Sequence, residues 1–149
     1  MKLLLVSPSR KFGKLVKVPK ALKIPQLGLH ILASLTPDNV DITVVDEEIR
    51  EIDFSSDFDL IGISCMTATA NRSYQLSDMF RQRGSKVVLG GIHPTILPQE
   101  AIRHAIAVVI GEAEGCLADV LNDFRKKKLQ KFYPMPEPDS QSPFPEARF

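Results

Sequence analysis

The chain has 149 residues, 44% of them hydrophobic and 25% charged, and a formal net charge of +1. These values are typical of one soluble globular domain and give no electrostatic reason to expect binding to nucleic acid or a membrane surface. The two cysteines, Cys65 and Cys116, lack metal-ligand spacing, so we expect buried thiols in a reducing cytoplasm. The apolar run at residues 3–6 is too short for a signal peptide or a membrane span.

Strand and helix patterns alternate along most of the chain. In chain order, the predicted elements are a strand at 3–6, a helix at 26–35, strands at 41–46 and 60–64, a helix at 71–83, a strand at 87–89, a helix at 98–105, a strand at 107–110 and a helix at 116–127. Between the first two elements lies a basic, irregular segment, 11–23, which we interpret as a solvated loop rather than a phosphate-binding one.

Some side chains and caps within these helices are also predicted. The first helix should turn Leu27, Ile31 and Leu35 toward the core, because they share one helical face. The helix at 71–83 should bury Tyr74, Met79 and Phe80 and end at Gly84, which suits the left-handed position after a helix.

Strands that alternate with helices predict a parallel sheet covered on both faces. We expect an α/β domain over 1–131 with a three-layer, flavodoxin-like (Rossmann-like), doubly wound five-stranded sheet in the order 2-1-3-4-5. Right-handed crossovers then place four loops, 7–10, 65–70, 90–95 and 111–115, on one edge. From Phe132 on, the many prolines predict a linker or tail at 132–149 and no packed element.

A pair of glycines follows the fourth predicted strand. Lys86–Thr95 reads Lys-Val-Val-Leu-Gly-Gly-Ile-His-Pro-Thr, so Gly90 and Gly91 leave a short apolar run. Glycines at such an exit let a ligand approach the backbone, and open α/β sheets bind ligands at the carboxyl ends of their strands. A tight strand-to-helix turn without a ligand explains the same residues, and this segment alone favours neither interpretation.

Familiar phosphate-binding patterns are missing. A phosphoacceptor receiver domain needs acidic residues where this chain has Ser7-Pro8 and Ser64-Cys65. Neither G-x-G-x-x-G after the first strand nor G-x-x-x-x-G-K-[ST] occurs. Small and hydroxyl side chains instead follow the third strand, in Cys65-Met66-Thr67-Ala68-Thr69-Ala70. Such a lining suits a long, mostly neutral ligand tail that passes between strands.

Several short motifs in a fixed order carry a resemblance to a known family. They are Leu29–Pro37, Val45-Asp46-Glu47, Asp59–Ser64, Thr67–Ala70, Gly90–Thr95, Pro98–Ala101 and Gly111–Gly115. Together they resemble the N-terminal cobalamin-binding domain of cobalamin-dependent radical S-adenosylmethionine enzymes. Within this family the chain resembles the anaerobic magnesium-protoporphyrin IX monomethyl ester cyclases and related uncharacterised methyltransferases. The resemblance covers nearly the whole chain, and residues 145–148 are similar to the linker that precedes the catalytic barrel.

The resemblance implies a cofactor and the residues around it. Ser64, Gly90 and Gly91 match positions that line the channel for the nucleotide tail of cobalamin. The other candidate cofactor-binding residues are Ser7, Met66, Thr67, Ala68, Thr69, His93, Thr95, Gly111 and Glu112. Many such domains carry D-x-H-x-x-G after the first strand, and its histidine ligates cobalt. Residues 7–13 contain neither Asp nor His, so we expect no protein histidine on cobalt and assign no metal ligand or catalytic residue.

The family's catalytic chemistry is expected elsewhere. In the resembling enzymes a radical S-adenosylmethionine barrel binds a [4Fe-4S] cluster and S-adenosylmethionine through C-x-x-x-C-x-x-C, which this chain lacks. We therefore expect a cytoplasmic cobalamin-binding domain of a methyltransferase or cyclase, with that barrel in the same parent chain as its partner. A flavin- or nucleotide-binding flavodoxin-like domain and a ligand-free docking domain are the alternatives. Local explanations also stay open, because Ser64 and Thr67 suit helix caps and Glu112 suits a helix dipole.

Overall fold

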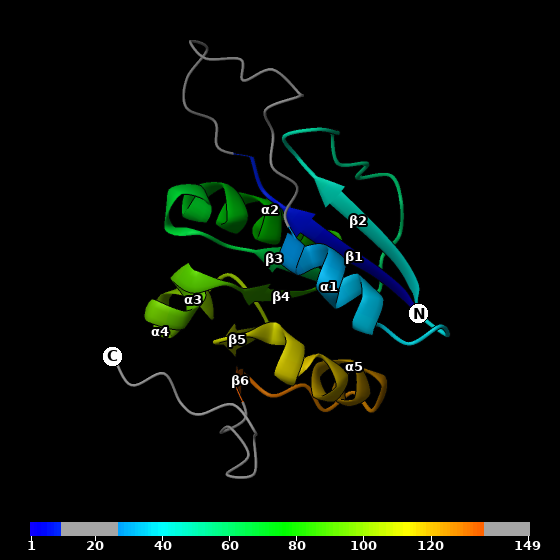
Figure 1. The fold of residues 1–149 in the computed structure, drawn as a ribbon. Coiled ribbons are helices and arrows are strands. Elements are labelled where there is room, and N and C mark those ends of the chain that lie inside the picture. Colours follow the sequence, from blue (N-terminus) through cyan, green and yellow to red (C-terminus); the bar gives the residue numbers. More distant parts are fainter. Residues whose placement is uncertain (10–26, 136–149) are drawn as a thin grey trace.

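The computed structural model describes residues 1–9 and 27–135. They form a six-stranded, all-parallel sheet in the order β2-β1-β3-β4-β5-β6, with helices on both faces (Figure 1). The strands are β1 (Lys2–Ser7), β2 (Asp41–Asp46), β3 (Leu60–Ser64), β4 (Lys86–Gly90), β5 (Ala107–Ile110) and β6 (Phe132–Pro134). The predicted flavodoxin-like order of the first five strands is confirmed. The basic segment 11–23, the start of the first predicted helix and residues 136–149 lie outside the described residues.

The helices divide between the two faces of the sheet (Figure 1). They are α1 (Leu27–Leu35), α2 (Ala70–Gln82), α3 (Ile92–Ile96), α4 (Pro98–Ala101) and α5 (Leu117–Arg125), with short 3₁₀ helices η2 (Thr67–Thr69) and η3 (Ala113–Gly115). Side chains alternate along β1, so Leu3 and Leu5 pack in one apolar cluster with residues of α1 and α5. Leu4 and Val6 pack in a second cluster with residues of α2 and α4.

The sheet has a sixth strand inside the segment predicted to be a linker. β6 pairs with β5, and Tyr133 is 3% exposed. The Tyr133 hydroxyl donates a hydrogen bond to Asp123 Oδ2 at 2.9 Å and accepts one from Gln130 N at 3.0 Å. Burial raises the pKa of Tyr133 to about 12, so this hydroxyl stays protonated. The prediction of no packed element after residue 131 is therefore wrong for 132–134, because the first proline, Pro134, ends this strand and the other four prolines follow it.

The buried side of α1 differs from the predicted one. Leu27, Ile31 and Leu35 are 69%, 37% and 52% exposed, whereas Leu29 is buried and Leu32 packs beside it. This helix is apolar on several sides, so its periodicity does not single out the face that meets the sheet. In α2, Tyr74 and Phe80 are buried as predicted, but Met79 is 37% exposed.

The end of α2 follows the prediction closely. Gly84 has a φ of +88°, and the amides of Gly84 and Ser85 donate to the carbonyls of Arg81 and Phe80. These two bonds form a Schellman motif, which satisfies the last carbonyls of the helix.

The segment after β4 differs from the predicted polar loop. Helix α3 starts directly after Gly91, and the helix predicted over 98–105 is the short α4. A backbone hydrogen bond from His93 N to Cys65 O, 3.2 Å, fixes this helix start against the end of β3. The exit of β4 is therefore a helical turn bonded to the end of β3.

Candidate ligand-binding site

A cavity of about 170 Å³ lies between the sheet and the helices α1 and α5. Its floor is one face of the sheet, from which Leu5 of β1, Gly62 of β3 and Val88 of β4 contribute. Five predicted site residues line it at the carboxyl ends of β3, β4 and β5: Ser64, Gly90, Gly91, Gly111 and Glu112. A ligand tail was predicted to pass between strands. The space lies instead between the sheet and its helical layer.

Glycines keep this space open. A Cβ atom on Gly62 would lie 2.8 Å from Leu5 Cδ2, and one on Gly90 would lie 3.5 Å from Val109 Cβ. Larger side chains at these positions would fill the cavity or displace its walls. The β4–β5 ladder is last paired at Leu89 and Val108, whereas β3 and β4 stay paired through Ser64 and Gly90. Ladder pairing between β4 and β5 therefore ends just before Gly90, at the level of the cavity mouth.

Gly91 has a conformation that suits glycine alone. Its φ of +106° and ψ of −175° lie in a region closed to other residues, and a Cβ would lie 2.9 Å from Cys65 O. The close approach allows two backbone bonds, from Cys65 N to Gly90 O at 2.7 Å and from His93 N to Cys65 O at 3.2 Å. The second glycine of the pair thus joins the exits of β3 and β4.

The charged side chains that line the cavity are both acidic. They are Glu112 and Glu114, which flank Ala113 at the start of η3. No Lys, Arg or His is among the described residues that line this space. Two carboxylates favour a ligand that offers hydrogen-bond donors, such as amides or hydroxyls, and repel a terminal phosphate. The rest of the lining is mostly aliphatic, which favours an apolar ring in the interior.

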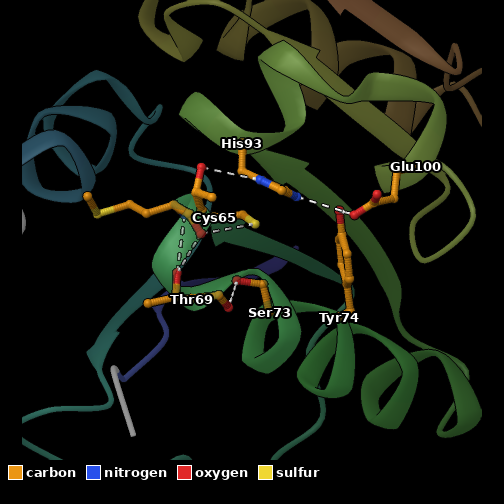
Figure 2. Close-up of polar contacts among 8 residues, drawn as sticks. Cys65, Thr69, Ser73, Tyr74, His93 and Glu100 are labelled. Carbon is orange, nitrogen blue, oxygen red and sulfur yellow. Dashed lines mark hydrogen bonds and ion pairs between the residues drawn. The ribbon is translucent and has the colours of Figure 1, made fainter. Parts of the chain in front are cut away.

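His93 lies on the opposite face of the sheet from this cavity. Figure 2 shows its ring extending toward Glu100, and Tyr74 of α2 reaching the same carboxylate. His93 Nδ1 lies 3.3 Å from Thr67 Oγ1, and Nε2 lies 3.3 Å from Glu100 Oε1. The Tyr74 hydroxyl donates to Glu100 Oε1 at 2.9 Å. Both ring nitrogens of the buried His93 therefore have protein partners, and the residue connects η2, α3 and α4.

The titrating groups in this network are shifted in opposite directions. Hydrogen bonds from Tyr74 and His93 lower the pKa of Glu100, so this carboxylate is ionised at neutral pH. Burial and the bond to Glu100 raise the pKa of Tyr74. Burial also raises the pKa of Cys65, which is fully enclosed beside the network (Figure 2). A protonated, enclosed thiol is a poor nucleophile, as the sequence interpretation expected.

The remaining predicted residues lie outside the cavity lining. Thr69 is buried, and its hydroxyl donates to Met66 O at 3.2 Å while accepting from Met66 N at 3.2 Å. Thr67 bonds to His93, and Met66 is 38% exposed. Ala68 lies between the two threonines in η2. A cofactor contact by these residues, by Ser7 or by Thr95 remains a prediction.

The exit of β1 is held by an ion pair. The carbonyl of the buried Ser7 accepts from Glu47 N at 2.9 Å, and Ser9 N donates to Glu47 Oε2 at 2.9 Å. Arg72 Nε donates to both carboxylate oxygens, at 3.0 and 3.1 Å, and a further short contact joins its NH2 group to Glu47. Burial alone would raise the pKa of Glu47, but Arg72 and the Ser9 amide outweigh it and lower that pKa.

Several cavity residues were not predicted. They come from the interior of β3, from η3 and from the covering helices α1 and α5: Gly28, Leu29, Leu32, Gly62, Glu114, Leu117, Val120 and Leu121. Gly62 carried a usable signal, since a glycine inside a strand indicates close approach by another group. The helix residues carried none, because their part in the cavity depends on how α1 and α5 sit on the sheet.

Two negative observations concern the described segments, 1–9 and 27–135. No helix within them is long and apolar enough to cross a membrane. They also contain no group of three or more His, Cys, Asp or Glu side chains arranged to hold a metal ion.

The fold is that of a flavodoxin-like domain with a cavity at the carboxyl edge of its sheet, the edge at which open α/β sheets bind ligands. The sequence profile of the family described as B12 binding domain matches residues 13–121. The chain belongs to this family.

Similar curated proteins are methyltransferases. The chain is 40% identical over 108 residues to a bacteriochlorophyllide d C-8(2)-methyltransferase of Chlorobaculum tepidum, covering 72% of this chain and 24% of that protein. It is 32% identical over 135 residues to the C-12(1)-methyltransferase of the same organism, covering 89% and 29%. An uncharacterized methyltransferase of Pyrococcus horikoshii is 28% identical over 144 residues, covering 88% and 31%. The chain thus spans less than a third of the length of these relatives.

One solved structure also aligns with the fold. It is the N-terminal domain of a hypothetical protein from Thermotoga maritima, with a TM-score of 0.46 and 16% sequence identity, covering 78% of this chain and 97% of that one.

Proposed function

We propose that this chain binds cobalamin and presents it to the catalytic domain of a radical S-adenosylmethionine methyltransferase or cyclase in the cytoplasm. The observation that carries the proposal is the aliphatic cavity whose mouth is formed by Gly90, Gly91 and Gly111 at the carboxyl edge of the sheet. Membership of the B12 binding domain family supports cobalamin as the occupant.

The residues present fit the nucleotide tail of this cofactor. The space of about 170 Å³ exceeds the roughly 150 Å³ of an aliphatic cavity that holds one benzene ring. Leu5, Leu29 and Val120 would surround the apolar base. Ser64 and Glu112 would accept hydrogen bonds from the ribose or amide groups at the mouth. Bound cobalamin supplies the methyl-transfer chemistry, and this chain supplies its position and surroundings.

We also propose that no histidine of this chain ligates the cobalt of the bound cofactor. Both nitrogens of His93 face Thr67 and Glu100, on the sheet face opposite the cavity. His30 is exposed on α1, and His104 is bonded through Nδ1 to Asp78. These placements support binding of the cofactor without a histidine ligand from this chain. His93→Gln should then leave the visible spectrum of bound hydroxocobalamin unchanged.

A catalytic partner in the same parent chain completes the proposal. The three methyltransferase relatives are each more than three times longer than the segment they share with this chain. We place the [4Fe-4S] cluster and S-adenosylmethionine in that further part. Two of the relatives are bacteriochlorophyllide d methyltransferases. On that ground we propose a tetrapyrrole substrate for the parent enzyme.

Retention of cofactors after desalting tests the binding proposal. The chain is mixed separately with hydroxocobalamin and with flavin mononucleotide, desalted, and its visible spectrum recorded. We expect retention of cobalamin alone, because Glu112 and Glu114 repel a terminal phosphate. Retention of flavin alone would favour the flavodoxin-like alternative. A folded protein that retains neither would favour a docking domain.

A further inference from the structure

Thr95, the last residue of the Gly-Gly-Ile-His-Pro-Thr motif, connects two loops through one hydroxyl group. Its Oγ1 donates to Gly91 O at 2.9 Å and accepts from Gly111 N at 2.9 Å. Gly91 and Gly111 both line the cavity, whereas Thr95 does not. The hydroxyl therefore joins the exits of β4 and β5 from outside the ligand space.

The strand geometry explains why such a connection is needed. The β4–β5 ladder ends at Leu89 and Val108, so β4 offers no ladder carbonyl to Gly111 N. Gly111 has a φ of +88°, and on its other side Met135 N donates to Ile110 O at 2.8 Å. Thr95 Oγ1 takes the place of the missing strand partner.

Helix α3 holds this hydroxyl in place. On the far side of the helix, His93 is bonded to Thr67 and Glu100, as Figure 2 shows for Glu100. The Thr95 amide also donates to Gly91 O at 3.1 Å. A five-residue helix has little stability of its own, so these bonds fix its orientation.

We propose that Thr95 is a positioning residue for ligand binding: it holds Gly111, and with it Glu112, at the mouth of the cavity. The inference rests on the proposed binding function. Without the hydroxyl, Gly111 N–H would lose its partner, and the Gly111–Gly115 loop would open toward solvent. The ligand would then have to order this loop on binding, which weakens affinity.

Three variants of the full chain test this role. Thr95→Val removes the hydroxyl with little change in shape, and Thr95→Ser retains it. Thr36→Val is the matched control, because Thr36 Oγ1 makes the same kind of bond to the carbonyl four residues back, Leu32 O, at 2.7 Å. Within residues 1–9 and 27–135, this hydroxyl connects no second loop. Each protein is measured without ligand, by hydrogen exchange of the Gly111 amide, and by its dissociation constant for hydroxocobalamin.

Thr95→Val should speed Gly111 exchange and weaken hydroxocobalamin binding, each by about fivefold or more, which corresponds to one lost hydrogen bond. Thr95→Ser should stay within about twofold of wild type in both measurements, and Thr36→Val should change neither. The proposal would be overturned if Thr95→Val showed the Gly111 exchange rate and the hydroxocobalamin affinity of the wild type. It would also be overturned if Thr36→Val changed both quantities as much as Thr95→Val does. No uptake of hydroxocobalamin by the wild type would refute the cobalamin proposal. In that case the exchange rate of the Gly111 amide alone would test the connection: faster exchange in Thr95→Val would support it, and an unchanged rate would contradict it.

Discussion

Replacement of Gly91 by alanine tests whether the exits of β3 and β4 must lie in backbone contact. The φ of +106° and ψ of −175° cost a residue with a Cβ about 1–3 kcal/mol. The new Cβ would also lie 2.9 Å from Cys65 O, a backbone atom that cannot rotate away. Shifting it weakens two backbone hydrogen bonds worth about 1 kcal/mol each. We expect Gly91→Ala to lower the free energy of unfolding by about 2–5 kcal/mol.

Urea unfolding of matched glycine variants separates these contributions. Gly84 has a φ of +88° and open space around its Cβ position, so Gly84→Ala should cost only about 1 kcal/mol. Gly28 lies in α1 with open space and no positive φ, so Gly28→Ala should stabilise by about 0.5–1 kcal/mol. A Gly91→Ala protein no less stable than Gly84→Ala would show that the contact with Cys65 is not tight, and the reasoning would fail.

Three further predictions concern residues that do not line the cavity. Glu47→Gln should lower the free energy of unfolding by about 1–3 kcal/mol near neutral pH. Because the pKa of Glu47 is lowered in the fold, its contribution is present above the usual 4.5 and lost as pH falls through the folded value, so urea unfolding of the two proteins should converge in acid. Lys127 has a φ of 56° after α5, and Lys127→Gly should stabilise by about 0.5–1 kcal/mol in the same assay; a loss of stability would contradict this. Tyr133→Phe removes the bonds to Asp123 and Gln130 N and should cost about 1–2 kcal/mol in thermal unfolding, whereas no change would show that they do not hold β6.

The sheet could be predicted from the sequence because each buried strand carries its own apolar run. Leu60–Ser64 and Ala107–Ile110 appear in the structure as predicted. The glycines at the mouth of the cavity could also be predicted, because Gly90 ends an apolar strand and Gly91 directly follows it.

Features that depend on tertiary packing could not be predicted. Leu29 rather than Ile31 is buried because α1 is apolar on several sides, and only its position over the sheet decides which one is covered. His93 follows the glycine pair, yet the first turn of α3 carries its side chain to the opposite face. Phe132–Pro134 forms a strand that is held by hydrogen bonds from the Tyr133 hydroxyl to Asp123 and from Gln130 N to that hydroxyl. The local proline content does not predict these contacts.

The most direct test of the central claim fills the cavity without unfolding the protein. In Gly90→Val, the added Cβ would lie at an ordinary 3.5 Å from Val109 Cβ, and its methyl groups would occupy the lined space. The measurement is the visible absorbance of hydroxocobalamin that stays with wild-type and variant protein after desalting, with unfolding curves to show that both are folded. We predict that the wild type retains the cofactor and that folded Gly90→Val retains none. Equal retention by the two proteins would contradict the claim that the cofactor enters this cavity.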